Sequence, residues 1–165
     1  MDSVHIHLIL NHVPILLTII SIPIVFWGYY RSNRSILRLG LLGFLIAGLT
    51  VIPVFLTGET AHERVENIQT VSEPYMEEHE DAAEVSLWLT LLLGIIGLSG
   101  LIIERYRPGF FHVYIAALLM VSLVTAGFLT YTGYLGGNIR HTELHNTTGL
   151  QKADAIHKDA DGDND

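Results

Sequence analysis

Four long stretches of the chain are mainly apolar and almost free of charge, and short polar segments separate them. Each holds close to the ~20 residues that a helix rising ~1.5 Å per residue needs to cross a ~30 Å hydrocarbon core. Buried helices of soluble proteins are usually shorter and carry a polar stripe, which these stretches lack. The pattern predicts an all-α integral membrane protein, a four-helix bundle within residues 1–149, with spans at about residues 5–30, 36–57, 84–104 and 110–136.

The segment between the second and third spans is polar and has two helical patches, at residues 59–68 and 74–84. We therefore expect a helical connection on that side of the bundle. Residues 150–165 form an acidic tail that ends in alternating aspartates, and its scarcity of apolar residues predicts disorder. No internal repeat at a fixed period is apparent.

Basic residues are distributed unevenly between the two sides of the predicted bundle. The loops after the first and third spans carry five of the nine lysines and arginines: Arg31, Arg34, Arg38, Arg105 and Arg107. Because cytoplasmic loops of membrane proteins are enriched in basic residues, these loops should face the cytoplasm. Both termini and sixteen of the seventeen acidic residues would then face outward. We expect a multi-pass protein of a bacterial inner membrane, with its termini on the periplasmic side.

The composition excludes several kinds of site and partner. The chain has no cysteine, which rules out disulfides, thiolate metal centres, iron–sulfur clusters and covalently attached c-type haem. Its net charge of −8 argues against a nucleic-acid partner, because phosphate backbones are bound by basic surfaces. The partner that the composition indicates is the lipid bilayer.

Eight of the nine histidines lie on the predicted outer side, several of them near the ends of the spans. Polar residues prefer loops and the outer loops are the longer ones, so chance accounts for part of this bias. The spacing of these histidines is a second indication of a metal site. Glu59 and His62 form one copy of the Glu-x-x-His pair that di-iron bundles use twice. Neutral imidazole is the commonest protein ligand of transition metals. The candidate metal ligands are His7, His12, His62, His79, His141, Glu59, Glu66 and Glu80.

Four short segments, read together, resemble one known family. They are residues 7–14 (HLILNHVP), 57–66 (TGETAHERVE), 77–83 (EEHEDAA) and 133–141 (GYLGGNIRH). The chain is similar over about residues 5–145 to a bacterial four-helix membrane family catalogued as domain of unknown function 2231. The resemblance implies a four-helix membrane fold, and it implies a haem or redox role because members often occur beside c-type cytochromes or fused to them. Leu8 and Val13 stand where members often have proline and phenylalanine.

A b-type haem near the outer face, used for electron transfer, is the first functional hypothesis. Two imidazoles on facing helices can bind haem iron axially, and the expected pair is His12 with His79 or His141 opposite. Glycines of the fourth span would leave room for the macrocycle: Gly127, Gly133, Gly136 and Gly137. The residues expected to hold the haem propionates are Tyr131, Tyr134 and Arg140. The acidic outer rim would attract a basic soluble cytochrome or another redox subunit.

Two other hypotheses stand beside the haem. A non-haem site for iron, zinc, manganese or copper would combine the same histidines with Glu59, Glu66 and Glu80. A cofactor-free structural subunit of a membrane complex would need no such site. Small residues on one face of the third span predict close helix packing in every case: Gly94, Gly97 and Gly100. All three hypotheses are compatible with a homo-oligomer.

Overall fold

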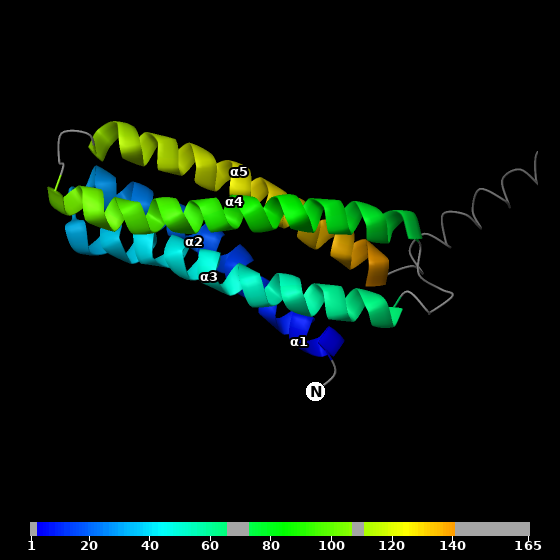
Figure 1. Ribbon diagram of the computed structural model, residues 1–165. Helices are drawn as coiled ribbons and strands as arrows, with labels where there is room; N and C mark the ends of the chain where they lie inside the picture. Colours follow the sequence, from blue (N-terminus) through cyan, green and yellow to red (C-terminus); the bar gives the residue numbers. More distant parts are fainter. Residues whose placement is uncertain (1–2, 66–72, 107–110, 141–165) are drawn as a thin grey trace, which may run out of the picture.

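The computed structural model is a bundle of long helices, and it describes residues 3–65, 73–106 and 111–140 (Figure 1). Its helices are α1 (Ser3–Leu10), α2 (His12–Tyr30), α3 (Arg34–Val65), α4 (Glu73–Tyr106) and α5 (Phe111–Arg140). Only Asn11 separates α1 from α2, and its backbone N–H donates to the carbonyl oxygen of His7 at 2.9 Å. These two helices therefore act as one rod, and the predicted all-α four-helix architecture is confirmed for the described residues.

Four helical segments are long and apolar enough to cross a membrane: Ile6–Tyr30, Arg34–Glu59, Met76–Glu104 and Phe111–Asn138. Many of their large apolar side chains are exposed, among them Leu16, Ile20, Leu49, Ile95 and Leu123. A surface of this kind is stable in lipid and unstable in water. The chain is therefore a multi-pass membrane protein.

The rods follow one another around the bundle in chain order. α2 packs along α3, α3 along α4, and α4 along α5, while α2 meets α5 over a smaller area. α2 and α4 therefore lie diagonally opposite each other. α1 continues α2 but leans on α3, which is its main packing partner. The polar connection predicted after the second span is helical as far as it is described, because α3 runs on to Val65 and α4 begins at Glu73.

The two ends of the bundle differ in their chemistry. We call the end that contains His7, Glu59, His79 and Gly136 the histidine end, and the end that contains residues 28–38 and 100–112 the arginine end. At the arginine end the turn before α3 is closed by Asn33, whose side-chain oxygen accepts from the backbone N–H groups of Ser35 and Ile36 at 3.1 and 3.2 Å. This is a helix N-cap, and it explains why α3 begins at Arg34.

The apolar core fills the half of the bundle nearer the arginine end. Its fully buried members are Val25, Leu37, Leu41, Phe44, Leu93, Ile115 and Leu118. An ion pair with one buried partner closes this end: Arg38 Nε donates to Glu104 Oε2 at 2.8 Å, and the Glu104 side chain is 4% exposed whereas that of Arg38 is 49% exposed. The Tyr29 hydroxyl forms a hydrogen bond with Nδ1 of His112, the histidine on the predicted cytoplasmic side. The histidine half has no comparable apolar core among the described residues.

Close packing of α3 on α4 depends on glycine, as the sequence predicts. A Cβ atom at Gly48 would lie 2.9 Å from Gly94 Cα, and one at Gly97 would lie 2.9 Å from the Leu41 carbonyl oxygen. Real side-chain carbons do not come this close to the backbone of a neighbouring helix, so larger residues at Gly48 and Gly97 would force α3 and α4 apart. Gly100 faces α5 as well, because its Cβ would lie 3.0 Å from the Tyr114 ring.

Diagonally opposite helices share part of their spacing of buried positions. The buried residues of α2 match buried positions of α4 at an offset of 72 residues: Pro14 with Ser86, Thr18 with Thr90, Ser21 with Leu93, Val25 with Gly97, and Gly28 with Gly100. Five buried positions of α3 match α5 at an offset of 78: Leu37 with Ile115, Gly40 with Leu118, Phe44 with Ser122, Ala47 with Thr125, and Val51 with Leu129. This spacing of three and four residues is the one that keeps a single helix face toward the bundle interior.

Candidate functional site

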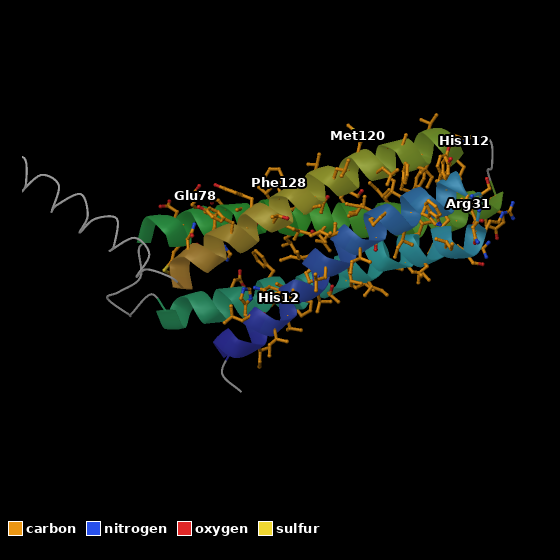
Figure 2. The ribbon with its side chains drawn as sticks, turned by 180° about the vertical axis from the view of Figure 1, so that it is seen from behind. His12, Arg31, Glu78, His112, Met120 and Phe128 are labelled. Carbon is orange, nitrogen blue, oxygen red and sulfur yellow. The ribbon has the colours of Figure 1, made fainter. Side chains whose placement is uncertain are left out.

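A cavity of about 620 Å³ opens at the histidine end, and all five helices line it. One of its lining residues, His12, is labelled in Figure 2. Its size lies within the range of roughly 300–1,000 Å³ that is usual for small-molecule and cofactor sites. The wall is apolar over much of its area, through Leu8, Ile15, Val51, Val54, Phe55, Met76 and Leu129. The predicted candidates His7, His12, Glu59, His79 and Glu80 all contribute to its lining.

His7 is held against α3 by two contacts. Its Nδ1 lies 3.1 Å from the carbonyl oxygen of Val54. Its ring rests on Gly58, where a Cβ atom would lie 3.1 Å from His7 Cε1. The hydroxyl of Thr57 approaches the same nitrogen at 3.4 Å and donates to the Val54 carbonyl at 2.9 Å. The Val54 carbonyl therefore orients the His7 ring, and Gly58, one turn further along α3, leaves the space that the ring occupies.

His79 is held against α5 in the same way. Its Nδ1 lies 3.0 Å from the carbonyl oxygen of Thr132. Its ring rests on Gly136, where a Cβ atom would lie 3.1 Å from His79 Cε1. In both cases the accepting carbonyl precedes the glycine by four residues, so carbonyl and glycine lie on one helix face. His7 and His79 are also 72 residues apart, the offset that relates α2 to α4.

This geometry defines the tautomer of both imidazoles. A carbonyl oxygen can only accept a hydrogen bond, so Nδ1 of each neutral ring carries the proton and Nε2 carries the lone pair. Histidines that ligate metals almost always donate their second ring N–H to a carbonyl, carboxylate or water, and this fixes ring orientation and raises ligand basicity. The two rings therefore have the hydrogen bonding of metal ligands and lie on diagonally opposite rods.

The remaining candidates have different surroundings. His12 lines the cavity but is exposed, and its Nδ1 donates to the carbonyl of Leu8, one turn back on its own chain, at 2.8 Å. Glu59 and Glu80 are exposed at the cavity rim, together with Asp81 and Glu84, which the sequence analysis did not select as ligands. His7 thus contacts a carbonyl of a neighbouring helix, as His79 does, whereas His12 contacts a carbonyl of its own rod.

Some predicted residues lie outside the described part of the chain. Glu66 and His141 are among them, as are the side chains of His62 in α3 and Arg140 in α5. Within the residues that the structure describes, no three His, Asp or Glu side chains form a group that could hold one metal ion. An axial pair on haem iron needs only two such side chains.

Tyr131 and Tyr134 are not among the described residues that line the cavity, and their predicted contacts with haem propionates stay a prediction. Both are exposed on α5, and Tyr131 donates to the carboxylate of Glu78 on α4. Four glycines of α5 were expected to make room for the haem macrocycle. Gly133, Gly136 and Gly137 line the cavity, and Gly127 does not.

Two supporting residues of the site were missed from the sequence. Asn11 lines the cavity at the junction of α1 and α2, and its buried Oδ1 has no hydrogen-bond partner in the described structure. Thr132 supplies the carbonyl for His79, and its hydroxyl lies 2.8 Å from Ser86 Oγ in the cavity wall. The role of Thr132 could not be predicted, because any residue type supplies a backbone carbonyl. Asn11 could have been selected, because it follows His7 by four residues and so lies on the same helix face.

Comparison with known proteins gives no relative: no family model matches the chain, and no curated protein and no solved structure matches it. The resemblance to the four-helix family therefore stays a prediction, and the function has to be argued from the cavity.

Proposed function

We propose that the protein binds a b-type haem in the cavity at the histidine end, with His7 and His79 as axial ligands, and that it carries electrons. The observation that supports this most strongly is the matched seating of the two imidazoles. Each ring has its Nδ1–H on a helix carbonyl at 3.0–3.1 Å and its Cε1 atom against a glycine. Two such rings on opposite rods are the donor set of six-coordinate haem.

The cavity fits a flat, largely apolar group in other respects. Gly137 has open space where a Cβ would stand, and Gly133 meets only the end of the Ile15 side chain at 3.7 Å. These two glycines are one helical turn apart, so they leave a smooth strip of α5 facing the cavity. Haem bound there would supply one-electron chemistry between ferric and ferrous iron.

The residues of this chain would orient the haem ligands, exclude water and tune the reduction potential of the haem. The carbonyls of Val54 and Thr132 orient the rings and keep Nε2 as the ligating nitrogen. Apolar side chains such as Val51, Phe55 and Leu129 exclude water from the inner part of the cavity. A low-polarity pocket disfavours the extra positive charge of the ferric state, so it raises the reduction potential.

We further propose that the histidine end faces the periplasm of a bacterial inner membrane, because arginines gather at the other end. The cavity rim then presents Glu59, Glu80, Asp81 and Glu84 to the outer aqueous phase. No lysine or arginine is among the described residues that line the cavity. A rim of this charge attracts a basic soluble cytochrome and speeds its encounter at low salt.

A non-haem transition-metal site is the second candidate, and the position of His12, Glu59 and Glu80 in the same cavity supports it. It would need ligands beyond the described residues, such as His62 or His141, to complete a coordination shell. A colourless protein with stoichiometric iron, zinc, manganese or copper would replace the haem proposal with this one.

The test is an absorption spectrum of protein purified in detergent without a polyhistidine tag, recorded oxidised and reduced. We expect a Soret band and a sharp α-band on reduction, as for a six-coordinate b-type haem. His7→Ala and His79→Ala should each lose the low-spin spectrum, while each variant still elutes as one species in gel filtration. His112→Ala is the control, because it removes an imidazole at the arginine end.

The same series decides between the two ligand assignments. If His12→Ala abolishes the spectrum and His7→Ala does not, the pair is His12 with His79. If wild-type protein carries neither haem nor a stoichiometric metal after reconstitution, the cofactor proposal falls and a structural role in a membrane complex takes its place.

A further inference from the structure

The arginine end has a shallow apolar groove on the outer surface between α2 and α3, which we call the α2–α3 groove. Its volume is about 390 Å³, and no charged residue is among the described residues that line it. The two helices pack tightly beside it, because a Cβ atom at Gly40 would lie 2.9 Å from the backbone nitrogen of Val25 and 3.2 Å from Ile24 Cγ2. The groove is therefore a feature of the surface and does not lead into the core. Its lining residues are Pro23, Ile24, Phe26, Trp27 and Ile36.

The α2–α3 groove lies on a part of the bundle that is apolar enough to face lipid. Its residues belong to the spans Ile6–Tyr30 and Arg34–Glu59. Phe26 and Trp27 are 55% and 52% exposed, and the rings of Trp27 and Tyr30 have centroids 6.2 Å apart at the end of the first span. Tryptophan and tyrosine are enriched at the boundary between the hydrocarbon and the lipid head groups. The groove therefore extends from the head-group level toward the hydrocarbon layer.

Arg31 supplies a positive charge at the head-group end of this groove. Its guanidinium carbon lies 5.8 Å from the centre of the Trp27 ring, which is part of the groove wall. Arg34 and Arg38 both contact Glu104 on α4, at 3.5 and 2.8 Å. Arg31 makes no ion pair among the residues that the structure describes, so its charge is available to a lipid head group.

We propose that the α2–α3 groove binds one acyl chain of an anionic phospholipid whose phosphate is bound by Arg31. The groove supplies an apolar wall for the chain, and the guanidinium supplies paired N–H donors that match the oxygens of a phosphate. Among the described side chains of the arginine end, Arg31, Arg34 and Arg38 face a single carboxylate, that of Glu104. This surplus of positive charge favours an anionic head group over a zwitterionic one.

A second copy of the chain fits the groove less well than a lipid does. Copies in one membrane share one orientation, and a two-fold contact brings the same surface patch of both copies together. The two Arg31 side chains would then face each other at equal depth, and no carboxylate is among the described residues of the groove to separate them. Like charges in such a contact repel. Figure 2 shows Arg31 at the other end of the bundle from His12, so this site is separate from the haem cavity and does not depend on the proposed function.

The chain has two tryptophans, and their positions allow a direct test: Trp27 lines the groove, and Trp88 is 63% exposed on α4. The Trp88→Phe variant reports on Trp27 alone, and the Trp27→Phe variant reports on Trp88 alone. Each full-length variant is reconstituted in bilayers that contain dibrominated phosphatidylglycerol or dibrominated phosphatidylcholine with identical chains, and the quenching of tryptophan fluorescence is measured. We expect phosphatidylglycerol to occupy the site beside Trp27 about fivefold more strongly than phosphatidylcholine, and both lipids to quench Trp88 equally.

Two arginine variants in the Trp88→Phe background test the bound head group. Arg31→Gln should make the two lipids quench Trp27 equally, because it removes the charge beside the groove. Arg34→Gln is the matched control, because this arginine is also exposed but lies 3.5 Å from Glu104 on α4. It should keep the preference of about fivefold for phosphatidylglycerol.

Three results overturn the proposal. Equal quenching of Trp27 by both lipids in the Trp88→Phe protein shows that the groove selects no anionic lipid. Equal loss of the preference in Arg31→Gln and Arg34→Gln shows that the whole basic end attracts anionic lipid, without a site beside Trp27. Quenching of Trp88 without any quenching of Trp27 shows that protein, such as a second copy of the chain, covers the groove.

Discussion

Alanine at Gly136 tests the seating of His79 with a single methyl group. A Cβ atom there lies 3.1 Å from His79 Cε1 and 3.5 Å from its Nδ1. Carbon atoms in ordinary contact are about 3.5–4.0 Å apart, so the ring has to retreat by roughly half an ångström. The bond from Nδ1 to the Thr132 carbonyl is already 3.0 Å long. Such a retreat from α5 takes it to the edge of hydrogen-bonding distance.

The expected loss follows from that bond. A neutral hydrogen bond contributes about 0.5–1.5 kcal/mol, and removing the second partner of a metal-ligating histidine typically lowers affinity by 10- to 100-fold. We expect Gly136→Ala to lower haem affinity by about tenfold. Gly127→Ala is the matched control, since Gly127 lies on the same helix, does not line the cavity, and its Cβ meets nothing within 4 Å. Both variants exchange glycine for a better helix former, so their difference isolates the ring contact.

The assay is titration of apoprotein with haemin in detergent, followed at the Soret band, with thermal unfolding of the same samples. Gly136→Ala should bind haemin more weakly than Gly127→Ala, although both unfold at similar temperatures. If Gly136→Ala binds haemin as tightly as Gly127→Ala and wild-type protein do, the contact with Gly136 does not position the His79 ring.

Three further predictions concern the packing of the bundle. Gly48→Ala places a Cβ 2.9 Å from Gly94 Cα, so it should cost about 1–3 kcal/mol of stability, whereas Gly127→Ala should be neutral in the same unfolding assay. Arg38→Ala should destabilise the protein by about 2–3 kcal/mol because the buried Glu104 loses its 2.8 Å partner. Arg34→Ala should cost less than about 1 kcal/mol, because the Arg34 side chain is 75% exposed and 3.5 Å away; equal effects would contradict this. A double-mutant cycle of Ser86→Ala and Thr132→Val should give a coupling near 0.6 kcal/mol, the average for hydrogen bonds between membrane helices, and zero coupling would show that the 2.8 Å contact is not formed.

The fold follows from the sequence because each span has to satisfy its backbone within itself while its side chains face lipid. Because of that constraint, mean hydropathy alone locates the four spans. Most of the predicted span ends lie within a few residues of those in the structure. The larger difference is at the third span, which begins at Met76 in the structure and near residue 84 in the prediction. Acidic residues at 77–84 end the apolar pattern, but they continue the same helix into the polar region as an exposed collar.

The site could be predicted only in part. Histidines on one side of the membrane pointed to a common layer, and the cavity contains three of them, His7, His12 and His79. The choice of His7 depends on the Val54 carbonyl and on Gly58, which approach it only after α1 leans on α3. The differences from the resembled family at Leu8 and Val13 did not predict that contact. Tyr131 and Tyr134 are exposed on α5, and their predicted role stays a prediction.

The two imidazoles also fix how the two sides of the cavity differ. His7 on the first rod and His79 on α4 each contact a carbonyl of the neighbouring helix in the same way. The offset of 72 residues that pairs them also pairs His12 with Glu84, and both of these residues line the cavity. One side of the opening therefore carries an imidazole and the other a carboxylate. A ligand with two unlike edges would meet different groups in its two orientations.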